Sequence, residues 1–346
     1  KIVGLNALAQ RFTAWGTIYT GIAAKDYMDG TGNFYGVHSV TLYVDSVQVF
    51  RSVTDEVSPN ENRMINGFTD YEELMKNRRL IMRSHKLPGN KLRLLHTDEN
   101  RGLVTIDEER DYRFMYVLED NFGNRKKYRF TVRGRKQEIP EQKQDSCKTL
   151  YWNRTNVIQE PGMEFVIPRG MLYDDAPLRT AVVGDSSNLS FEYTLDARHT
   201  PLHGFCQLAI GIRNDTLADK SKYYIRNRVG KWTSSVGGKY DNGWMKADIR
   251  QWGNFSVAVD TIAPNVTPIG QNLWRTRRDI RFRVSDGQTG IASYKVLIDG
   301  KFVLFALKKG VLIIQDPDRV KKGVPHTAEV IVADNCGNVT RKQYKF

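Results

Sequence analysis

The chain has 346 residues and a formal net charge of +13 at pH 7. Its hydrophobic content of 40% is enough to build packed cores, and its length suits about three domains of ordinary size. No apolar run approaches the roughly 20 residues that a membrane helix needs, so we expect no transmembrane segment. The basic residues are scattered and match no recognition helix, zinc finger or stacking-aromatic motif, so we expect no nucleic-acid partner. We interpret them as solvated surface, with attraction to an anionic polymer or a membrane surface as the alternative.

An internal repeat organises the sequence. Residues 36–45 (GVHSVTLYVD) resemble residues 290–299 (GIASYKVLID). In both, a glycine turn leads into alternating Val, Ile, Leu and Tyr, and an Asp closes the run, which is typical of a half-buried strand that ends at a hairpin. Each copy is followed by Asp-Asn-x-Gly-Asn, at 120–124 and 334–338, a composition that favours a tight loop between strands. The repeat predicts two copies of one antiparallel module of immunoglobulin type.

The first module is expected at residues 1–135. Asp45 and Asp120 are 75 positions apart, whereas Asp299 and Asp334 are 35 apart, so the first copy contains an insertion, placed within 51–100. Inside it, Thr69 to Glu72 has the pattern of a capping box and residues 73–79 are helix formers. This pattern predicts a short helix beside the sheet.

The middle and last regions also have strand patterns. A polar stretch, 136–145, is expected to be a linker. Short alternating runs at 164–167, 189–193, 207–210, 223–225 and 255–259 predict a distinct β-sandwich domain over 136–260. After Pro264 the repeat returns, which predicts an immunoglobulin-like sandwich over 261–346. The expected fold is therefore all-β: three tandem β-sandwich domains, the first and third immunoglobulin-like, with a short helical insertion in the first.

Three aromatic residues, Trp232, Tyr240 and Trp244, lie around a Ser- and Gly-rich segment, 234–238, which we expect to be a flexible loop. Rings beside such a loop can stack on sugars, so the three are candidate contacts to a glycan or a partner protein. Aromatic residues at strand ends also cap hydrophobic cores. Burial of the rings distinguishes the two interpretations.

Recognisable catalytic and metal-binding motifs are missing from the sequence. It contains no His-x-His, HExxH, Gly-x-Ser-x-Gly or phosphate-binding loop. His199 and His203 are close, but Pro201 between them opposes the helix that would direct both at one metal ion. The three cysteines form no CxxC pair, and we expect buried or inert thiols. We therefore expect no catalytic residues, no metal ligands and no cofactor in this chain.

An ordered set of segments resembles a known family. The pieces are 36–45, 70–71, 87–92, 117–124, 165–175, 201–203, 230–232, 253–264 and 298–305. Together they look like the region that follows the catalytic domain in large envelope peptidases of Gram-negative gut-type bacteria, which belong to the lysostaphin-like (LytM-type) zinc metallopeptidase family. That family holds its zinc with a His, an Asp and a His-x-His pair. The resemblance implies a non-catalytic β-domain tail, or a free-standing relative, with zinc expected only in a catalytic domain absent here.

Three functions follow as hypotheses. The first is a non-catalytic accessory or scaffolding region that positions a peptidoglycan endopeptidase in the cell envelope, or that binds the wall or partner proteins. The alternative is an independent surface protein for glycan binding or adhesion. An enzyme in its own right would require converging carboxylates, or His199 and His203 on a metal. We expect a cell-wall or envelope-protein partner and an exported location, periplasmic or on the cell surface, in a bacterium.

Overall fold

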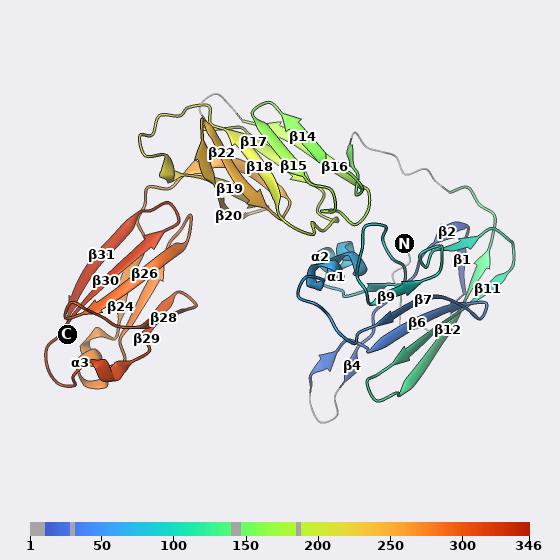
Figure 1. Cartoon of the computed structure of the whole chain (residues 1–346), viewed down its shortest axis with the longest axis horizontal. Coiled ribbons are helices and arrows are strands. Elements are labelled where there is room, and N and C mark those ends of the chain that lie inside the picture. Colours follow the sequence, from blue (N-terminus) through green and yellow to red (C-terminus); the bar gives the residue numbers. More distant parts are fainter. Residues whose placement is uncertain (1–10, 28–31, 140–146, 185–187) are drawn as a thin grey trace. The chain divides into compact units, whose positions relative to one another are not determined.

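The computed structural model describes residues 11–27, 32–139, 147–184 and 188–346. The chain is all-β, as predicted, with a few short helices (Figure 1). It divides into two compact units. The first unit contains residues up to 156 with segments 168–179 and 197–205, and the second contains 157–167, 180–196 and 206–346. None of the described helices combines the length and the apolar character that crossing a membrane requires.

One six-stranded sheet dominates residues 11–134, and we call it the N-terminal sheet. Its order is β1-β12-β11-β6-β7-β9, with β1 (Arg11–Ala14), β6 (Ser39–Val44), β7 (Val47–Val53), β9 (Leu95–Thr97), β11 (Asp111–Glu119) and β12 (Arg125–Gly134). Only the β1–β12 pair is parallel among these neighbours. Tyr112, Phe114 and Tyr116 alternate with more exposed residues along β11, so one face of the sheet lies on the core.

Three two-stranded sheets accompany the N-terminal sheet. They are formed by β2 (Gly16–Ile18) with β10 (Val104–Ile106), β3 (Gly21–Ile22) with β8 (Met82–Arg83), and β4 (Asp26–Tyr27) with β5 (Phe34–Tyr35). Strands β2 and β3 occupy part of the segment that precedes the repeated strand. Ile106, in β10, is fully buried and belongs to the same hydrophobic core as Phe114.

The predicted insertion holds the helical segments of this region: η1 (Asn62–Met64), α1 (Ile65–Phe68) and α2 (Tyr71–Asn77). The short helix is confirmed, but the predicted cap is wrong by one residue. Asp70 is the N-cap, and its carboxylate accepts the backbone N–H of Glu73 at 3.3 Å. Thr69 does not cap the helix because its hydroxyl donates to the carbonyl of Ile65 at 2.9 Å.

The strands from residue 148 to residue 259 form two sheets. One has the order β13-β16-β17-β23-β19-β20 and the other β14-β15-β18-β22-β21. The strands are β13 (Lys148–Leu150), β14 (Asn156–Glu160), β15 (Met163–Ile167), β16 (Ala176–Val183), β17 (Glu192–Asp196), β18 (Cys206–Gly211), β19 (Tyr223–Val229), β20 (Trp232–Gly237), β21 (Lys239–Asp241), β22 (Trp244–Ile249) and β23 (Gly253–Val259), with one helical turn, η2 (Lys220–Lys222).

Two details of this region differ from the sequence-based expectations. The strand predicted at 189–193 begins at Glu192, because the hydroxyl of Ser190 accepts the backbone N–H of Val257 at 2.8 Å in place of a ladder partner. The predicted flexible loop at 234–238 is largely strand β20, which pairs antiparallel with β19. Pairing along a neighbouring strand supplies ladder hydrogen bonds that outweigh the weak strand preference of Ser and Gly. Most of the linker predicted at 136–145 lies outside the described residues.

Residues 265–345 form two four-stranded sheets, which we call the C-terminal sandwich. One sheet has the order β24-β25-β29-β28 and the other β27-β26-β30-β31. The elements are β24 (Asn265–Ile269), η3 (Gln271–Leu273), α3 (Trp274–Arg277), β25 (Arg281–Ser285), β26 (Ile291–Ile298), β27 (Lys301–Phe302), β28 (Phe305–Lys308), β29 (Val311–Ile314), η4 (Pro317–Arg319), β30 (Thr327–Asp334) and β31 (Val339–Lys345). Trp274 and Phe282 are fully buried in its core.

The strand order confirms the internal duplication. Four neighbouring strands of the N-terminal sheet follow the order β7-β6-β11-β12, and four in the C-terminal sandwich follow β27-β26-β30-β31. In each copy the repeated run of residues supplies the second strand of this set. Asp45 and Asp299 end those runs at turns with left-handed φ angles of 48° and 50°. The same sequence pattern therefore produces the same local structure twice.

Candidate functional site

The repeated Asp-Asn-x-Gly-Asn segment forms a tight loop in both copies. The first loop, residues 120–124, connects β11 to β12. The Oδ1 atom of Asp120 accepts the backbone N–H groups of Phe122 and Asn124 at 2.8 and 2.9 Å, and its Oδ2 accepts the side-chain amide of Asn124 at 2.7 Å. The amide of Asn124 is the main reason that the pKa of Asp120 lies below its usual range. The first loop is open to solvent, and Phe122 at its tip is 92% exposed.

The last loop, residues 334–338, connects β30 to β31 with the same hydrogen bonds. Asp334 accepts the backbone N–H groups of Cys336 and Asn338 at 2.9 and 2.8 Å, and the side-chain amide of Asn338 at 2.8 Å. Unlike the first loop, this loop is mostly buried. Asp334 and Cys336 are each only 3% exposed.

Residues that precede the C-terminal sandwich in the sequence cover the last loop. The ammonium of Lys222, in η2, donates to the carbonyl of Cys336 at 2.9 Å. The side-chain amide of Asn338 donates to the carbonyl of Asp260 at 3.0 Å. Both contacts lie within the second compact unit. The last loop is thus a hydrogen-bonded joint between the C-terminal sandwich and the strands before it.

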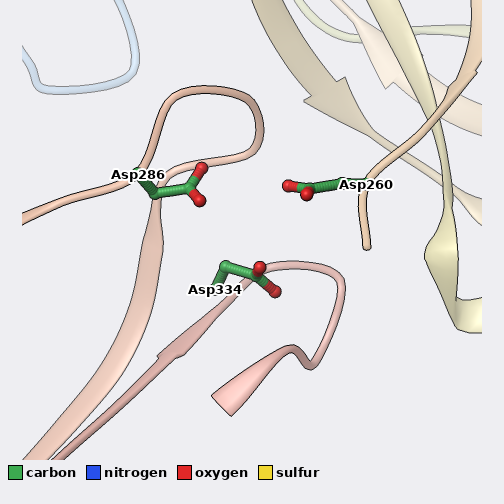
Figure 2. Close-up of side chains that lie close together, drawn as sticks. All are labelled: Asp260, Asp286 and Asp334. Carbon is green, nitrogen blue, oxygen red and sulfur yellow. The ribbon is translucent and has the colours of Figure 1, made fainter. Parts of the chain in front are cut away.

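Three carboxylates meet at this joint. Figure 2 shows Asp260, Asp286 and Asp334 directed toward one another from three separate segments, and one oxygen of each lies within 4.8 Å of the others. Asp260 is fully buried, and its carboxylate accepts the hydroxyl of Thr289 at 2.7 Å and the backbone N–H of Ile262 at 3.0 Å. We call these three residues the carboxylate cluster.

Backbone donors neutralise part of the charge of the carboxylate cluster. The Oδ2 atom of Asp286 accepts three consecutive backbone N–H groups, those of residues 288, 289 and 290, at 2.9, 2.8 and 2.7 Å. Carboxylate oxygens are also the ligands that hard divalent cations prefer. Within the described residues this is the one group of three His, Cys, Asp or Glu side chains close enough to hold a metal ion. Sequence reasoning identified the loop of Asp334 but did not bring Asp260 and Asp286 to it, because the three lie far apart along the chain.

Two buried cysteines carry thiols that stay protonated at neutral pH. Burial, together with the nearby carboxylates of Asp260 and Asp334, raises the pKa of Cys336 to about 11. Burial also raises the pKa of Cys206 to about 12. None of the three cysteines, of which Cys147 is half-buried, forms a disulfide. Of the expected buried or inert thiols, burial is confirmed for Cys206 and Cys336.

The three candidate aromatic contacts have different environments. Trp232 begins β20 and is 84% exposed, whereas Trp244 begins β22, is 36% exposed and lies against Gly211. Tyr240, in β21, is half-buried and donates its hydroxyl to Asp215 at 2.6 Å. The three rings are therefore not all in a core, and the two tryptophans face solvent to different degrees.

Tyr240 also belongs to a polar cluster that the sequence did not predict. Its ring stacks on Tyr223 with centroids 6.4 Å apart, and the ammonium of Lys220 lies 5.3 Å from the Tyr240 centroid and forms an ion pair with Asp215. The hydrogen bonds from Lys220 and Tyr240 lower the pKa of Asp215, and the hydrogen bond to Asp215 raises the pKa of Tyr240. This cluster fixes the Tyr240 ring in place.

His203 contacts Tyr173 and Arg63. Its Nδ1 lies 2.8 Å from the hydroxyl of Tyr173, and Arg63 of the insertion donates to its backbone carbonyl at 2.8 Å. The Tyr173 hydroxyl also donates to the carbonyl of Arg63 at 2.8 Å. These contacts lie within the first compact unit. In the described part of the chain, His199 and His203 are not part of any group of three metal-binding side chains.

The fold and these sites define an all-β chain with a duplicated immunoglobulin-like strand order. Residues 147–260 match the sequence model of a family described as Zu5-like domain, which covers less than half of the chain. No curated protein matches the chain.

Several solved structures are distantly similar to the chain. Fibronectin(III)-like modules of CbhA from Clostridium thermocellum share 10% identity over 98% of this chain and 89% of theirs, with a TM-score of 0.18. A Ca²⁺-stabilised adhesin with which an Antarctic bacterium binds ice shares 11% over 97% and 95%, with a TM-score of 0.15. The protein SGBP-B from the mixed-linkage glucan utilisation locus of Bacteroides ovatus, in complex with a heptasaccharide, shares 10% over 100% and 67%, with a TM-score of 0.15. Similarity at this level carries no conclusion about function.

Proposed function

We propose that this chain is a non-catalytic accessory region of an exported bacterial envelope protein, and that it positions a lysostaphin-like peptidoglycan endopeptidase. The observation that carries the proposal is the duplicated loop, of which one copy forms a joint and the other is exposed. The ordered sequence resemblance to the region after the catalytic domain in that family supports the link to a peptidase. The proposal assigns no catalytic residue to the chain.

The two copies of the loop differ mainly in what covers them. The last loop, with Cys336 at its tip, is held by Lys222 and Asp260. The first loop has the same internal hydrogen bonds, but its tip is Phe122, which is 92% exposed. A large ring on a loop that is already ordered loses little entropy on binding and provides a contact that excludes water. We infer that the first loop contacts a neighbouring domain, and that the peptidase domain is this neighbour.

The reading frame upstream of Lys1, and the protein that it encodes, test this proposal. We expect a segment with a spaced His/Asp pair and a His-x-His. In the whole protein, amides of residues 120–124 should exchange with deuterium more slowly than in the isolated chain. Phe122→Ser should remove this protection, whereas the matched control Phe302→Ser, at an exposed position of β27, should leave it unchanged. A lipid-attachment signal directly upstream, or equal exchange in the two proteins, would contradict the proposal.

Glycan binding is the second candidate function, and the exposure of Trp232 favours it. An indole that is 84% exposed is available to stack on a sugar ring. Co-sedimentation with purified peptidoglycan sacculi and with neutral polysaccharides measures this binding. We expect Trp232→Ala to weaken it about fivefold, since an aromatic stacking contact contributes about 1 kcal/mol. The control Tyr35→Ala should have no effect, and unchanged binding by Trp232→Ala would exclude this site.

A further inference from the structure

The outer face of the N-terminal sheet carries a pocket of about 440 Å³. Its lining includes Arg11 of β1, Tyr43 of β6, Arg113 and Met115 of β11, and Arg129 and Thr131 of β12. The strand register explains why these side chains meet. Met115 lies opposite both Arg129 and Tyr43, and Arg113 lies opposite Thr131. Residues directly opposite one another on neighbouring strands face the same side of a sheet.

Positive charge predominates in this pocket, which we call the basic pocket. Arg11 pairs with Asp111 at 3.2 Å. Arg113 and Arg129 are exposed, and neither forms an ion pair with any residue that the structure describes. Burial raises the pKa of the nearby Asp45, whereas the backbone N–H of Arg113 and the guanidinium of Arg110 lower it, and the charge of the Arg113 guanidinium contributes least. Two guanidinium groups are therefore available for an external anion.

We propose that the basic pocket binds the carboxylate groups of an acidic polysaccharide. A guanidinium presents a planar pair of donors that matches a carboxylate, and such charge-assisted hydrogen bonds are the stronger ones. A volume of about 440 Å³ lies in the range of ordinary ligand pockets. The proposal goes beyond the proposed accessory role and does not depend on it, because the first loop and the peptidase take no part in this binding.

The surroundings of the pocket favour a polysaccharide over other anionic partners. A membrane surface requires apolar side chains that protrude beside the basic ones, but Met115 and Phe130 are half-buried in the lining. Single-stranded nucleic acid requires exposed aromatic rings on which bases stack, and Tyr43 is half-buried. An extended peptide adds to the edge of a sheet, whereas β11 already pairs with strands on both sides.

The binding of the whole chain to polygalacturonate, measured by calorimetry, tests the proposal. We expect binding that weakens with added salt and that Arg113→Ala with Arg129→Ala reduces about 10- to 100-fold, because two charge-assisted contacts are lost. The matched control, Lys295→Ala with Lys308→Ala, removes the same charge from exposed strands of the C-terminal sandwich and should bind as the parent does. Arg113→Lys with Arg129→Lys keeps the charge and the fold but loses the planar fork, so its affinity should fall between the two.

Four outcomes would overturn the proposal. The first is that the parent chain does not bind polygalacturonate, and the second is that the two double alanine variants, at the arginines and at the control lysines, lose affinity equally. The third and fourth are tighter binding to polyglutamate, or to vesicles of anionic lipid, than to polygalacturonate. Melting temperatures of the variants that match the parent establish that a loss of binding is not a loss of folding.

Discussion

His85 shows how burial controls a single titratable group. It is 5% exposed, and its Nδ1 has no hydrogen-bond partner among the described residues. Its ring lies 4.3 Å from that of Tyr19. Burial, reinforced by the positive charges of Arg83 and Arg101 and opposed by Asp70, lowers the pKa of His85 to about 4. The folded chain therefore holds this imidazole neutral under conditions in which an unfolded chain would protonate it.

Acid is expected to destabilise the first compact unit through His85. Between its ordinary pKa of about 6.5 and the folded value, the unfolded chain binds more protons than the folded one, so stability falls as the pH falls through this window. The full contribution is roughly 3 kcal/mol in unfolding free energy. Denaturant unfolding at several pH values measures it. His85→Gln should flatten the pH dependence in this window, and an unchanged slope in that variant would show that other groups cause it.

At the scale of elements, the turn after the repeated strand has the same interactions in both copies: an Asp accepts a backbone N–H and pairs with a basic side chain. The basic side chain differs between the copies. In the first copy, Asp45 accepts the backbone N–H of Arg113 at 2.9 Å and pairs with Arg110 at 2.6 Å. In the last copy, Asp299 accepts the backbone N–H of Thr327 at 2.9 Å and pairs with His326 at 2.6 Å. An arginine stays charged at any ordinary pH, but a histidine does not. Only the second turn is therefore sensitive to pH near neutrality.

We expect the C-terminal sandwich to lose stability as the pH rises above the ordinary pKa of a histidine, about 6.5. Burial lowers the pKa of His326, but its hydrogen bonds to Asp299 and to the carbonyl of Lys321 outweigh burial and raise that pKa above its usual value. The stabilisation is complete below the unfolded pKa and is lost as the pH rises through the folded one. Thermal unfolding on both sides of neutral pH measures the effect. His326→Gln should unfold independently of pH over this range, and a parent chain that is equally stable at both pH values would refute the prediction.

At the scale of the whole molecule, the two loops provide a comparison within one chain. Asn338 and Asn124 hold equivalent places in the last and first loops. Only Asn338 reaches another region, through its hydrogen bond to the carbonyl of Asp260. Asn338 is 9% exposed, whereas Asn124 is on the surface. Equivalent substitutions should therefore have different consequences.

Asn338→Ala is expected to loosen the joint before the C-terminal sandwich. The variant loses two buried side-chain hydrogen bonds, which corresponds to about 2 kcal/mol of unfolding free energy, and amides around residues 222 and 260 should exchange faster with deuterium. Asn124→Ala is the control, since it removes the local bond to Asp120 alone. Equal effects of the two variants on exchange at the joint would show that Asn338 acts only within its own loop.

Much of the local structure could be predicted from the sequence. The all-β class and the two matching hairpin loops follow from the alternation of side chains and from the Asp-Asn-x-Gly-Asn pattern, because these signals act between residues that are near one another in the chain. The N-cap at Asp70 and the strand at residues 232–237 were missed. The hydroxyl of Thr69 bonds the carbonyl of Ile65, four residues earlier, in place of capping the next helix. Strand β20 forms because it pairs with β19.

The sequence alone determined the internal repeat and the all-β class, and it shows that the chain contains no His-x-His motif. The tertiary structure decided which copy of the loop is covered, that Asp260, Asp286 and Asp334 meet, that Trp232 is exposed, and that Arg113 and Arg129 share a pocket. The physical reason is the distance along the chain over which each interaction acts. Turn and strand signals depend on neighbouring residues, whereas burial and the meeting of charges depend on segments that only the folded chain brings together.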